Sequence, residues 1–404
     1  MIYRGPNTAH GRGTASTVPA WVSDDNLLNF NEGVATTGWS ISSGSGSITQ
    51  ASSSVRLTST SAAVISDLSI VGPTASTDYL FMVNASAKYT AGQYSTIRLL
   101  SGATTMLDIS LGYDHVGATA TVGTISALSS GVSQAIATGL NYETTPQSII
   151  VHVDRNYSCV NLFIKEAGGK WNFAGSFTYA AGFASIDSAK LITSAHNGQW
   201  AEYDWLGFAK PNIISIGDSI CAGHNFFDPA PGNYAGVDSY ANSWQKHATV
   251  YTTLRNNLIL NKGIGSETST QIQARMASYV TAHGPRLVYL HASTNDQVQS
   301  VSAATRSAQI QAGVDAINAI SAKCILLNAM YGTSGNAINP AHRDYMDSWW
   351  TTDRLSLTGV EQFINIMTPM DSGSNYMNAT LTESDGIHPK AAGYEAIGAK
   401  VITG

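Results

Sequence analysis

Five apolar runs, each followed by a helical pattern, occupy the second half of the chain and restrict its fold most strongly. The runs lie near residues 213–217, 257–261, 286–292, 323–329 and 362–367, and the helical patterns near 239–254, 268–282, 303–321, 341–353 and 390–402. Strands that alternate with helices form a parallel sheet with helices on both faces. Residues 210–404 are therefore predicted to form a flavodoxin-like, three-layer α/β/α domain, whose ligands bind at the carboxyl edge of the sheet.

The first of these strands leads directly into a serine. Ile213–Gly217 is predominantly apolar, Gly217 permits a tight turn, and Ser219 falls in the first turn of the following helix. A hydroxyl there would lie at the carboxyl edge of the sheet, beside backbone N–H groups that can bind a developing oxyanion. A serine before a helix is also a common N-cap. This segment alone supports a nucleophile and a cap about equally.

A second candidate pair lies near the C-terminus, in Asp385-Gly386-Ile387-His388-Pro389. An aspartate three residues before a histidine can fix the imidazole tautomer, so that the other ring nitrogen accepts a proton from a serine. The alternative is an N-cap aspartate with an incidental histidine. The serine segment and the Asp-x-x-His segment occur in one chain, in that order, with strand–helix units between them. We therefore favour the catalytic interpretation of both.

Together these segments resemble the SGNH (GDSL-type) hydrolase family, whose four sequence blocks supply a serine, a glycine, an asparagine and a terminal Asp-x-x-His. The resemblance begins at Pro211 and covers about half of the chain. It implies that Ser219, Asp385 and His388 are catalytic, and that no cofactor is needed.

The segment that resembles the family's second block is Asn261–Ser269. Ser266 stands where the family has its oxyanion glycine, and Gly265 lies beside it. A serine can still donate its backbone N–H, provided that its φ need not be positive. An ordinary glycine-rich turn is the alternative.

The segment that resembles the third block ends in Asn295-Asp296, with Ser293 at the usual glycine position. An ordinary turn or helix cap is the alternative. The resemblance implies an oxyanion hole made by the backbone N–H of Ser219, the backbone N–H of Gly265 or Ser266, and the side-chain amide of Asn295.

The first half of the chain has a different texture. Residues 1–25 are polar and are interpreted as an N-terminal arm or linker. Residues 26–209 contain short alternating runs separated by Gly, Ser, Asn and Asp, which predicts an all-β sandwich of the jelly-roll or lectin type. Such a domain suggests glycan binding, and Trp39, Trp171 and Trp200 could stack on sugar rings. Filling the core is the more common role of a tryptophan.

Three further residues are candidates for substrate binding. Trp349 and Trp350 could line an acyl or sugar pocket, or pack their helix against the sheet. At least one of two adjacent helical residues points away from the deepest core. His224 belongs to a long mixed loop that could form a pocket wall.

Composition excludes several classes of partner. The net charge of −6 argues against nucleic acid and anionic membranes as partners. No apolar run is long enough to span a bilayer, and the first twenty residues lack the apolar core of a signal peptide.

Cys159, Cys221 and Cys324 are expected to be buried free thiols. No metal site is expected, because the chain lacks His-x-x-Glu-His and Cys-x-x-Cys spacings.

These observations predict a serine esterase that removes O-acetyl groups from a polysaccharide through an acyl-serine intermediate. One alternative is a general short-chain carboxylesterase or lipase-like enzyme. Another is a non-catalytic glycan-binding virion or cell-surface protein with a degenerate hydrolase fold. The expected partner is an acylated carbohydrate or small ester. The location stays open, with a phage tail or the extracellular space favoured, and a homo-oligomer would suit the former.

Overall fold

The structure is a computed structural model. It describes residues 27–29, 39–50, 54–61, 63–68, 78–88, 94–113, 123–129, 132–137, 147–154, 159–165, 171–178, 186, 188–193, 199–209, 211–223, 243–250, 258–292, 294–328, 330, 340–372 and 377–403. The chain divides into two compact units, one formed by Met1–Lys165 and Ala174–Lys210, the other by Glu166–Phe173 and Pro211–Gly404. The predicted arm at residues 1–25 lies outside the described residues.

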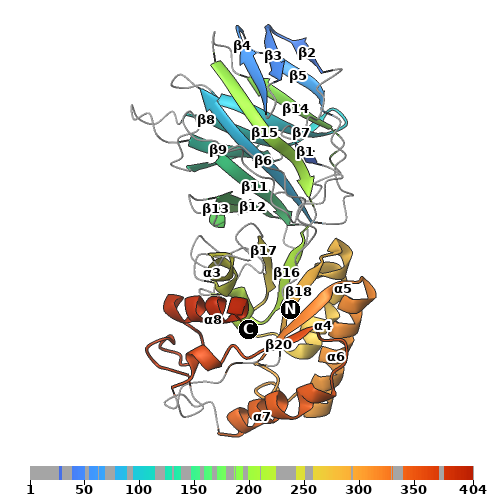
Figure 1. Cartoon of the computed structure of the whole chain (residues 1–404), viewed down its shortest axis with the longest axis vertical. Helices are drawn as coiled ribbons and strands as arrows, with labels where there is room; N and C mark the ends of the chain where they lie inside the picture. The colour runs from blue at the N-terminus through green and yellow to red at the C-terminus, as the bar shows by residue number, and fades with distance from the viewer. Residues whose placement is uncertain are drawn as a thin grey trace. The chain divides into compact units, whose positions relative to one another are not determined.

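The N-terminal unit is built from two antiparallel sheets (Figure 1). The first sheet has the order β13–β12–β11–β6–β15–β4–β3, with β1 also paired to β15; the second has the order β10–β9–β8–β7–β14–β5–β2. The strands of the first sheet are β1 (Leu27–Asn29), β3 (Gly46–Gln50), β4 (Val55–Ser59), β6 (Tyr79–Lys88), β11 (Gln147–Asp154), β12 (Cys159–Lys165), β13 (Trp171–Thr178) and β15 (Gln199–Ala209). Those of the second are β2 (Ser40–Ser43), β5 (Ala63–Leu68), β7 (Tyr94–Ser101), β8 (Thr104–Tyr113), β9 (Gly123–Ser129), β10 (Val132–Ala137) and β14 (Ser188–Thr193).

The two sheets share one apolar core. Leu57 and Phe81 from the first sheet are fully buried in the same cluster as Ile97 and Leu191 from the second. Along β14, buried and partly exposed residues alternate strictly, as expected for a strand with one face toward a core. This arrangement is a β-sandwich, in agreement with the sequence pattern.

The C-terminal unit contains a five-stranded parallel sheet. Its strands are β16 (Ile213–Gly217), β17 (Ile259–Gly263), β18 (Leu287–His291), β19 (Lys323–Leu327) and β20 (Gln362–Ile364). Their order in the sheet is β17–β16–β18–β19–β20, which is the flavodoxin-like order 2-1-3-4-5. The strand that follows β16 in the sequence lies on one side of it, and the later strands lie on the other side. The end of β16 is therefore the switch point where such sheets bind ligands.

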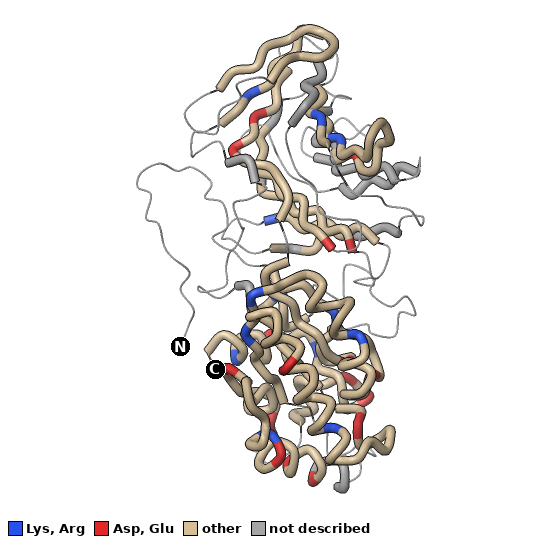
Figure 2. Tube along the Cα trace, turned by 90° about the vertical axis from the view of Figure 1, so that its right-hand side faces the viewer, with Lys and Arg blue, Asp and Glu red and all other residues tan. Residues whose placement is uncertain are grey.

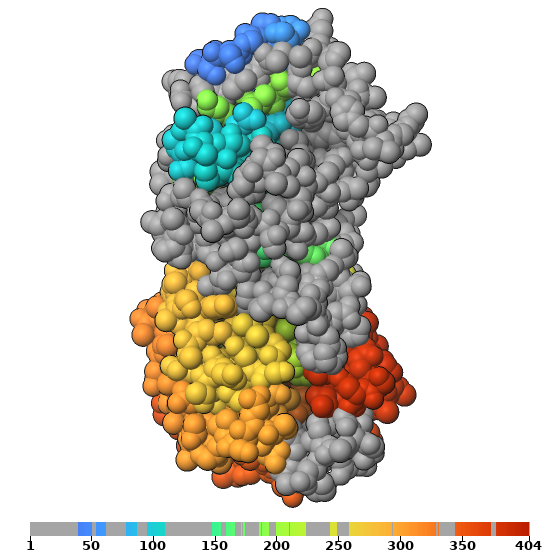
Figure 3. All heavy atoms as spheres, turned by 180° about the vertical axis from the view of Figure 1, so that it is seen from behind, coloured from blue at the N-terminus to red at the C-terminus, as the bar shows by residue number. Residues whose placement is uncertain are grey.

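Helices cover both faces of this sheet, as the alternating pattern predicts. They are α1 (Ser219–Ala222), α3 (Trp244–Val250), α4 (Ser269–Ala274), α5 (Met276–Tyr279), α6 (Ala303–Ala319), α7 (Pro340–Thr351) and α8 (Ala391–Thr403), with 3-10 turns η3 (Thr281–His283), η4 (Asp353–Ser356) and η5 (Thr368–Met370). Buried residues of α3, α7 and α8 share one apolar cluster with β16 and β19. Helices α4–α6 form a continuous face, yellow to orange in Figure 3. No helix in the described ranges has the length and apolarity needed to cross a bilayer.

The helix predicted over residues 268–282 is interrupted. Helix α4 ends at Ala274, Arg275 has φ −100° and ψ 2°, and α5 begins at Met276. The Arg275 guanidinium donates to the carbonyl oxygens of Lys262 and Gly217, at the ends of β17 and β16. The break in the helix thus coincides with the residue whose side chain is bound to the sheet edge.

The approach of β17 to α1 requires a glycine at residue 263. A Cβ at Gly263 would lie 2.3 Å from the Ala222 nitrogen and 2.7 Å from the Ala222 Cα. Both atoms are backbone, so no side-chain rotation relieves the overlap. The end of β17 can therefore lie against α1 only without a side chain at this position.

Replacing Gly263 with alanine should lower the free energy of unfolding by about 3 kcal/mol, the upper part of the usual range for overpacking. The comparison variant is Gly313→Ala in α6, where the nearest atom to a new Cβ is the flexible Met276 Cε at 3.3 Å. Alanine is favoured over glycine within a helix by about 1 kcal/mol. This gain should offset the small displacement of the Met276 side chain, so the stability of this variant should be close to that of the wild type. Urea unfolding curves with the same midpoint for both variants would contradict the expectation.

Candidate active site

The turn after β16 positions the serine. Asp218 is the N-cap of α1, and its side chain accepts a hydrogen bond from the Ile220 N–H at 3.0 Å. Ser219 is the first residue of α1 and is 4% exposed. A Cβ at Gly217 would lie 2.5 Å from the His291 carbonyl oxygen, so only glycine allows β18 to pass this close to the turn. The N-cap role that the sequence left open thus belongs to Asp218.

The loop before α8 positions the histidine. One carboxylate oxygen of Asp385 accepts from the backbone N–H groups of Ile387 and His388, at 2.9 Å and 3.0 Å. The Glu383 N–H donates to the His388 carbonyl oxygen at 2.7 Å. These bonds close a compact turn, in which the aspartate is held by the two backbone N–H groups that follow Gly386. The turn also fixes the distance from the carboxylate to the imidazole.

Folding brings the serine, the histidine and the aspartate into one hydrogen-bonded chain. His388 Nε2 lies 2.9 Å from Ser219 Oγ, although the two residues are 169 positions apart. His388 Nδ1 lies 2.5 Å from the other carboxylate oxygen of Asp385. An ionised carboxylate only accepts, so Nδ1 carries the proton and Nε2 accepts from the serine hydroxyl. His388 is 8% exposed, so its ring is shielded from most solvent.

The carboxylate of Asp385 is held in its ionised form. Partial burial raises its pKa, but the Ile387 N–H, the His388 side chain and the His388 N–H together lower it below the ordinary value. An ionised carboxylate keeps the proton of His388 on Nδ1. It also stabilises the positive charge that the imidazole gains when Nε2 takes up a second proton.

The segment with the degenerate second block lies between β17 and α4. Ser266 has φ +64°, the left-handed conformation that glycine adopts without strain. The positive φ that the sequence analysis set against this serine is present, and Ser266 adopts it nonetheless, at a cost of order 1 kcal/mol. Its carbonyl oxygen accepts from Gln299 Nε2 at 2.5 Å. This bond contributes to holding the strained backbone in place.

The third block lies beside the second. Asn295 Nδ2 donates to the Glu267 carbonyl oxygen at 3.0 Å, so its amide is oriented by the loop that contains Gly265 and Ser266. Asp296 is fully buried and accepts from the Ser269 N–H, in the first turn of α4, at 2.8 Å. The two blocks thus form one hydrogen-bonded unit. Ser293 lies outside the described residues.

Residues that the sequence analysis did not single out hold the serine turn in place. Asn261 Nδ2 donates to the Ala222 carbonyl oxygen at 2.9 Å, and its Oδ1 accepts from the Gly263 N–H at 2.9 Å. Gln245 Nε2 donates to the Cys221 carbonyl oxygen at 2.7 Å. Asn261 was visible as the first residue of the second block. Gln245 belongs to no block, so nothing in the sequence indicated this contact.

A buried histidine–aspartate contact lies next to the serine. His291 Nδ1 is 3.0 Å from Asp218 Oδ1, and both side chains are buried. Burial raises the pKa of Asp218, but the charge and hydrogen bond of His291, with hydrogen bonds from Thr294 and Ile220, lower it below the ordinary value. The N-cap of α1 therefore carries a negative charge. His291, the last residue of β18, contacts this cap.

The weaker candidates take other positions. Trp349 is 1% exposed, and the Arg306 guanidinium lies 5.0 Å from its ring. Trp350 packs edge-to-face against Phe363, with ring centroids 6.2 Å apart. These contacts agree with the alternative in which the two tryptophans pack their helix rather than line a substrate pocket. His224 lies outside the described residues.

The cysteine close to the serine does not compete as a nucleophile. Cys221 is free and buried, and burial raises the pKa of its thiol to about 12. Only the thiolate is reactive, so this thiol is inert at neutral pH.

Charged residues of both signs are mixed along the described part of the C-terminal unit (Figure 2), so neither positive nor negative residues dominate this view.

Comparison with known proteins gives one family match. Residues 215–396 match the family model described as the GDSL-like Lipase/Acylhydrolase family. Solved structures with similarity include an acetyl xylan esterase from Geobacillus stearothermophilus, 16% identical, covering 48% of this chain and 93% of that chain with a TM-score of 0.38. The psychrotrophic esterase EstA from Pseudoalteromonas is also 16% identical, covering 48% of this chain and 95% of that chain with a TM-score of 0.38. No curated protein matches the chain.

Proposed function

Because residues 215–396 match the model of the GDSL-like lipase/acylhydrolase family, we propose that the protein is a serine esterase with Ser219 as its nucleophile. The observation that carries the proposal is the hydrogen-bonded chain from Ser219 Oγ through His388 to Asp385, with distances of 2.9 Å and 2.5 Å. A nucleophile in contact with a base that is itself oriented by a third group is the geometry needed for acyl transfer. A protein that only binds its ligand would not need this hydrogen-bonded series of side chains.

In the first half-reaction, Ser219 Oγ attacks the ester carbonyl while His388 Nε2 takes up the hydroxyl proton. The carbonyl π electrons move to the oxygen, which becomes the oxyanion of a tetrahedral intermediate. When the intermediate collapses, the bond to the alcohol oxygen breaks and His388 returns its proton to the leaving alkoxide. The products of this step are the free alcohol and an acyl-serine.

In the second half-reaction, water replaces the alcohol. His388 Nε2 removes one proton from the water as its oxygen attacks the acyl carbonyl, and the same nitrogen then protonates Ser219 Oγ as it leaves. Asp385 stays ionised through both half-reactions. The carboxylic acid is released, and the serine and the histidine return to their starting states.

The proposed oxyanion donors are the Ser219 backbone N–H, the backbone N–H of Gly265 or Ser266, and the Asn295 side-chain amide. Two features support this set: Asn295 is bonded to the loop that contains Gly265 and Ser266, and the end of β17 lies against α1. Donors held in place before the reaction stabilise developing charge without reorganisation. The left-handed backbone of Ser266 fits a position where the direction of one N–H is functionally constrained.

Replacing Asn295 with alanine should lower kcat for p-nitrophenyl acetate by roughly 10²–10³, the usual effect of losing one oxyanion donor. The matched comparison is Asn328→Ala. Asn328 follows β19 at the same edge of the sheet, but it accepts from the Ile366 N–H and donates to Asn365. That variant should lose stability and keep its kcat. Equal decreases of kcat in the two variants would remove Asn295 from the proposed oxyanion hole.

The finer proposal is that the acyl group is acetyl and the alcohol a polysaccharide hydroxyl. The feature that favours a carbohydrate is the β-sandwich in the same chain, an architecture shared by many carbohydrate-binding modules. The test is acetate release from O-acetylated polysaccharides, compared with hydrolysis of p-nitrophenyl esters of two to eight carbons by the same protein. Acetate release with little activity beyond the acetyl ester supports deacetylation, whereas rising activity on longer esters assigns a general carboxylesterase.

A further inference from the structure

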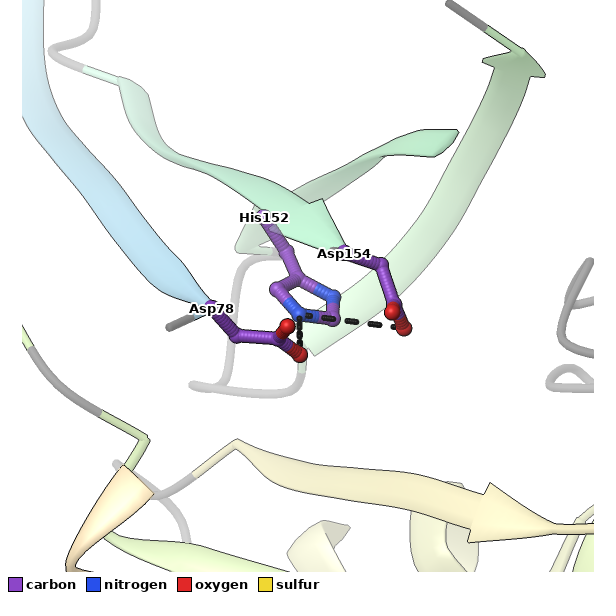
Figure 4. A group of neighbouring side chains, drawn as sticks. All are labelled: Asp78, His152 and Asp154. Atoms are coloured by element: carbon purple, nitrogen blue, oxygen red, sulfur yellow. Dashed lines mark hydrogen bonds and ion pairs between the residues drawn. The ribbon is translucent and has the colours of Figure 1, made fainter. Parts of the chain in front are cut away.

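The N-terminal sandwich contains a buried group of two carboxylates and one imidazole. Figure 4 shows Asp78, His152 and Asp154 with their polar ends turned toward one another. His152 Nε2 lies 3.0 Å from Asp78 Oδ2 and 4.0 Å from Asp154 Oδ2. One ligand atom from each residue lies within 4.8 Å of the other two. The group belongs to a different unit from the proposed catalytic residues, so it is independent of the esterase assignment.

All three side chains are withdrawn from water. Asp78, His152 and Asp154 are each 0% exposed. Asp78 directly precedes β6, while His152 and Asp154 occupy alternate positions at the end of β11, so they project from the same face of the strand. Strands β6 and β11 are neighbours in the sheet, with Tyr79 paired to Val153. The three groups therefore meet where one strand begins and its neighbour ends.

The imidazole is oriented from behind. His152 Nδ1 lies 3.3 Å from Asn161 Nδ2, on the neighbouring strand β12. Amide oxygen and nitrogen exchange places by a simple rotation of the side chain, so Asn161 can either donate to Nδ1 or accept from it. When it accepts, Nδ1 holds the proton and the lone pair of Nε2 points between the two carboxylates. In that orientation an oxygen acceptor lies behind the rear nitrogen, as the carboxylate, backbone carbonyl or water does behind metal-bound histidines.

The ligand atoms are of the kinds that bind a divalent cation: two carboxylate oxygens and an imidazole nitrogen. With both carboxylates ionised and the imidazole neutral, the three side chains carry a formal charge of −2. A divalent ion among the three ligand atoms would bring their combined charge to zero.

We propose that Asp78, His152 and Asp154 bind a divalent transition-metal ion, of the Zn²⁺ or Mn²⁺ type, as a structural site of the β-sandwich. Ligand atoms at about 2.0–2.4 Å from one ion are separated by roughly 3.0–4.8 Å, depending on the angle between them. The distances of 3.0 Å and 4.0 Å lie within this range. An imidazole with two carboxylates suits Zn²⁺ or Mn²⁺ better than Ca²⁺ or Mg²⁺, which prefer oxygen ligands alone.

Such an ion would join β6 to β11 at one end of the sheet. Because the ligands come together only in the folded chain, metal binding adds directly to the stability of the N-terminal unit. Catalysis does not need this site, since none of its residues takes part in the proposed ester hydrolysis. The prediction concerns stability and metal content rather than turnover.

The test uses the full chain. Protein purified without chelator is analysed for metals by plasma mass spectrometry, then stripped with EDTA, dialysed, and titrated with ZnCl₂ or MnCl₂. We expect about one divalent ion per chain. The unfolding temperature should rise with the logarithm of the free metal concentration, as ligand linkage requires. Titrations with CaCl₂ and MgCl₂ in parallel should give little change.

Two variants separate metal binding from general destabilisation. Asp154→Asn keeps the size of the side chain but removes one anionic ligand, so the metal-dependent rise should disappear while the metal-free unfolding temperature stays the same or increases. The matched comparison is Asp108→Asn, which removes a buried carboxylate that pairs with Arg98 in the other sheet. That variant should be less stable but should respond to metal like the wild type. Asn161→Ala should weaken metal binding by roughly 10–100-fold.

Three results would overturn the proposal. The first is a wild-type chain that contains no metal as purified and whose unfolding temperature does not respond to millimolar Zn²⁺ or Mn²⁺. The second is a metal response of equal size in Asp154→Asn, which would place the ion elsewhere. The third is a response to Ca²⁺ that exceeds the response to both transition metals. If Asp154→Asn fails to fold, the metal content and titration of the wild-type protein decide the question.

Discussion

Replacement of Ser219 with alanine is expected to abolish hydrolysis of p-nitrophenyl acetate, with a fall in kcat on the order of 10⁶. The methyl group cannot form the acyl-enzyme, and His388 is left without the hydroxyl whose oxygen lies 2.9 Å away. Binding of the ester should change little, because the methyl group occupies less space than the hydroxymethyl group. The loss should therefore appear in kcat and not in KM.

A fluorophosphonate probe tests the same residue independently of turnover. The wild type should be labelled at Ser219 and the Ser219→Ala variant should not. The matched comparison is Ser215→Ala, which removes a buried hydroxyl from β16 that donates to the Leu260 carbonyl oxygen and has no contact with His388. That variant should still be labelled. Labelling of the Ser219 variant, or turnover at the wild-type rate, would refute the assignment of the nucleophile. A wild-type chain that is not labelled would favour the non-catalytic alternative.

Replacement of Asp385 with asparagine is expected to lower kcat by about 10⁴ while leaving the fold intact. The amide can donate to His388 Nδ1, which places the histidine proton on Nε2. That nitrogen would then face Ser219 as a donor and could no longer accept the hydroxyl proton. Asp371→Asn, which changes an aspartate in the turn after η5, should keep the wild-type kcat. A kcat for Asp385→Asn within tenfold of the wild type would show that the carboxylate does not orient the base.

The same variant has a pH dependence that follows from the ionised carboxylate. The pKa of Asp385 is held below its ordinary value of 3.8. The ionised group therefore contributes stability that is complete above this value and is lost as the pH falls through the lower, folded-state pKa. Urea unfolding should show a constant difference between wild type and Asp385→Asn near neutral pH. The difference should shrink below about pH 4. A difference that grows on acidification would contradict the direction of the shift.

The fold class could be read from the sequence because it depends on local patterns. Every strand predicted after residue 211 overlaps an observed strand, since buried parallel strands are nearly continuous apolar runs. The boundaries were less accurate where a side chain bonds to a distant element. The helix predicted over 268–282 is divided at Arg275, whose guanidinium is bound to the carbonyl oxygens of Gly217 and Lys262. No local pattern contains that information.

The candidate catalytic residues could be named from the sequence because their motifs are short and specific. Each of the two segments contains its own turn: Asp218 caps α1, and the Asp385 carboxylate binds the next backbone N–H groups. The segment that resembles the second block was harder to interpret. Ser266 departs from the expected glycine, and only its φ of +64° shows that the glycine-like backbone is retained. The contacts of Gln245 and His291 with the serine turn also lie outside any motif.

By itself, the sequence indicated the two architectures and singled out the serine, the histidine and the aspartate as candidate catalytic residues, because periodicity and short motifs are properties of neighbouring residues. The distance of 2.9 Å between two atoms 169 residues apart was decided only by the tertiary structure. The same is true of the group formed by Asp78, His152 and Asp154, in which His152 lies 74 residues after Asp78. Strand pairing brings such residues together, and pairing between distant strands depends on the packing of the whole sheet rather than on any local segment.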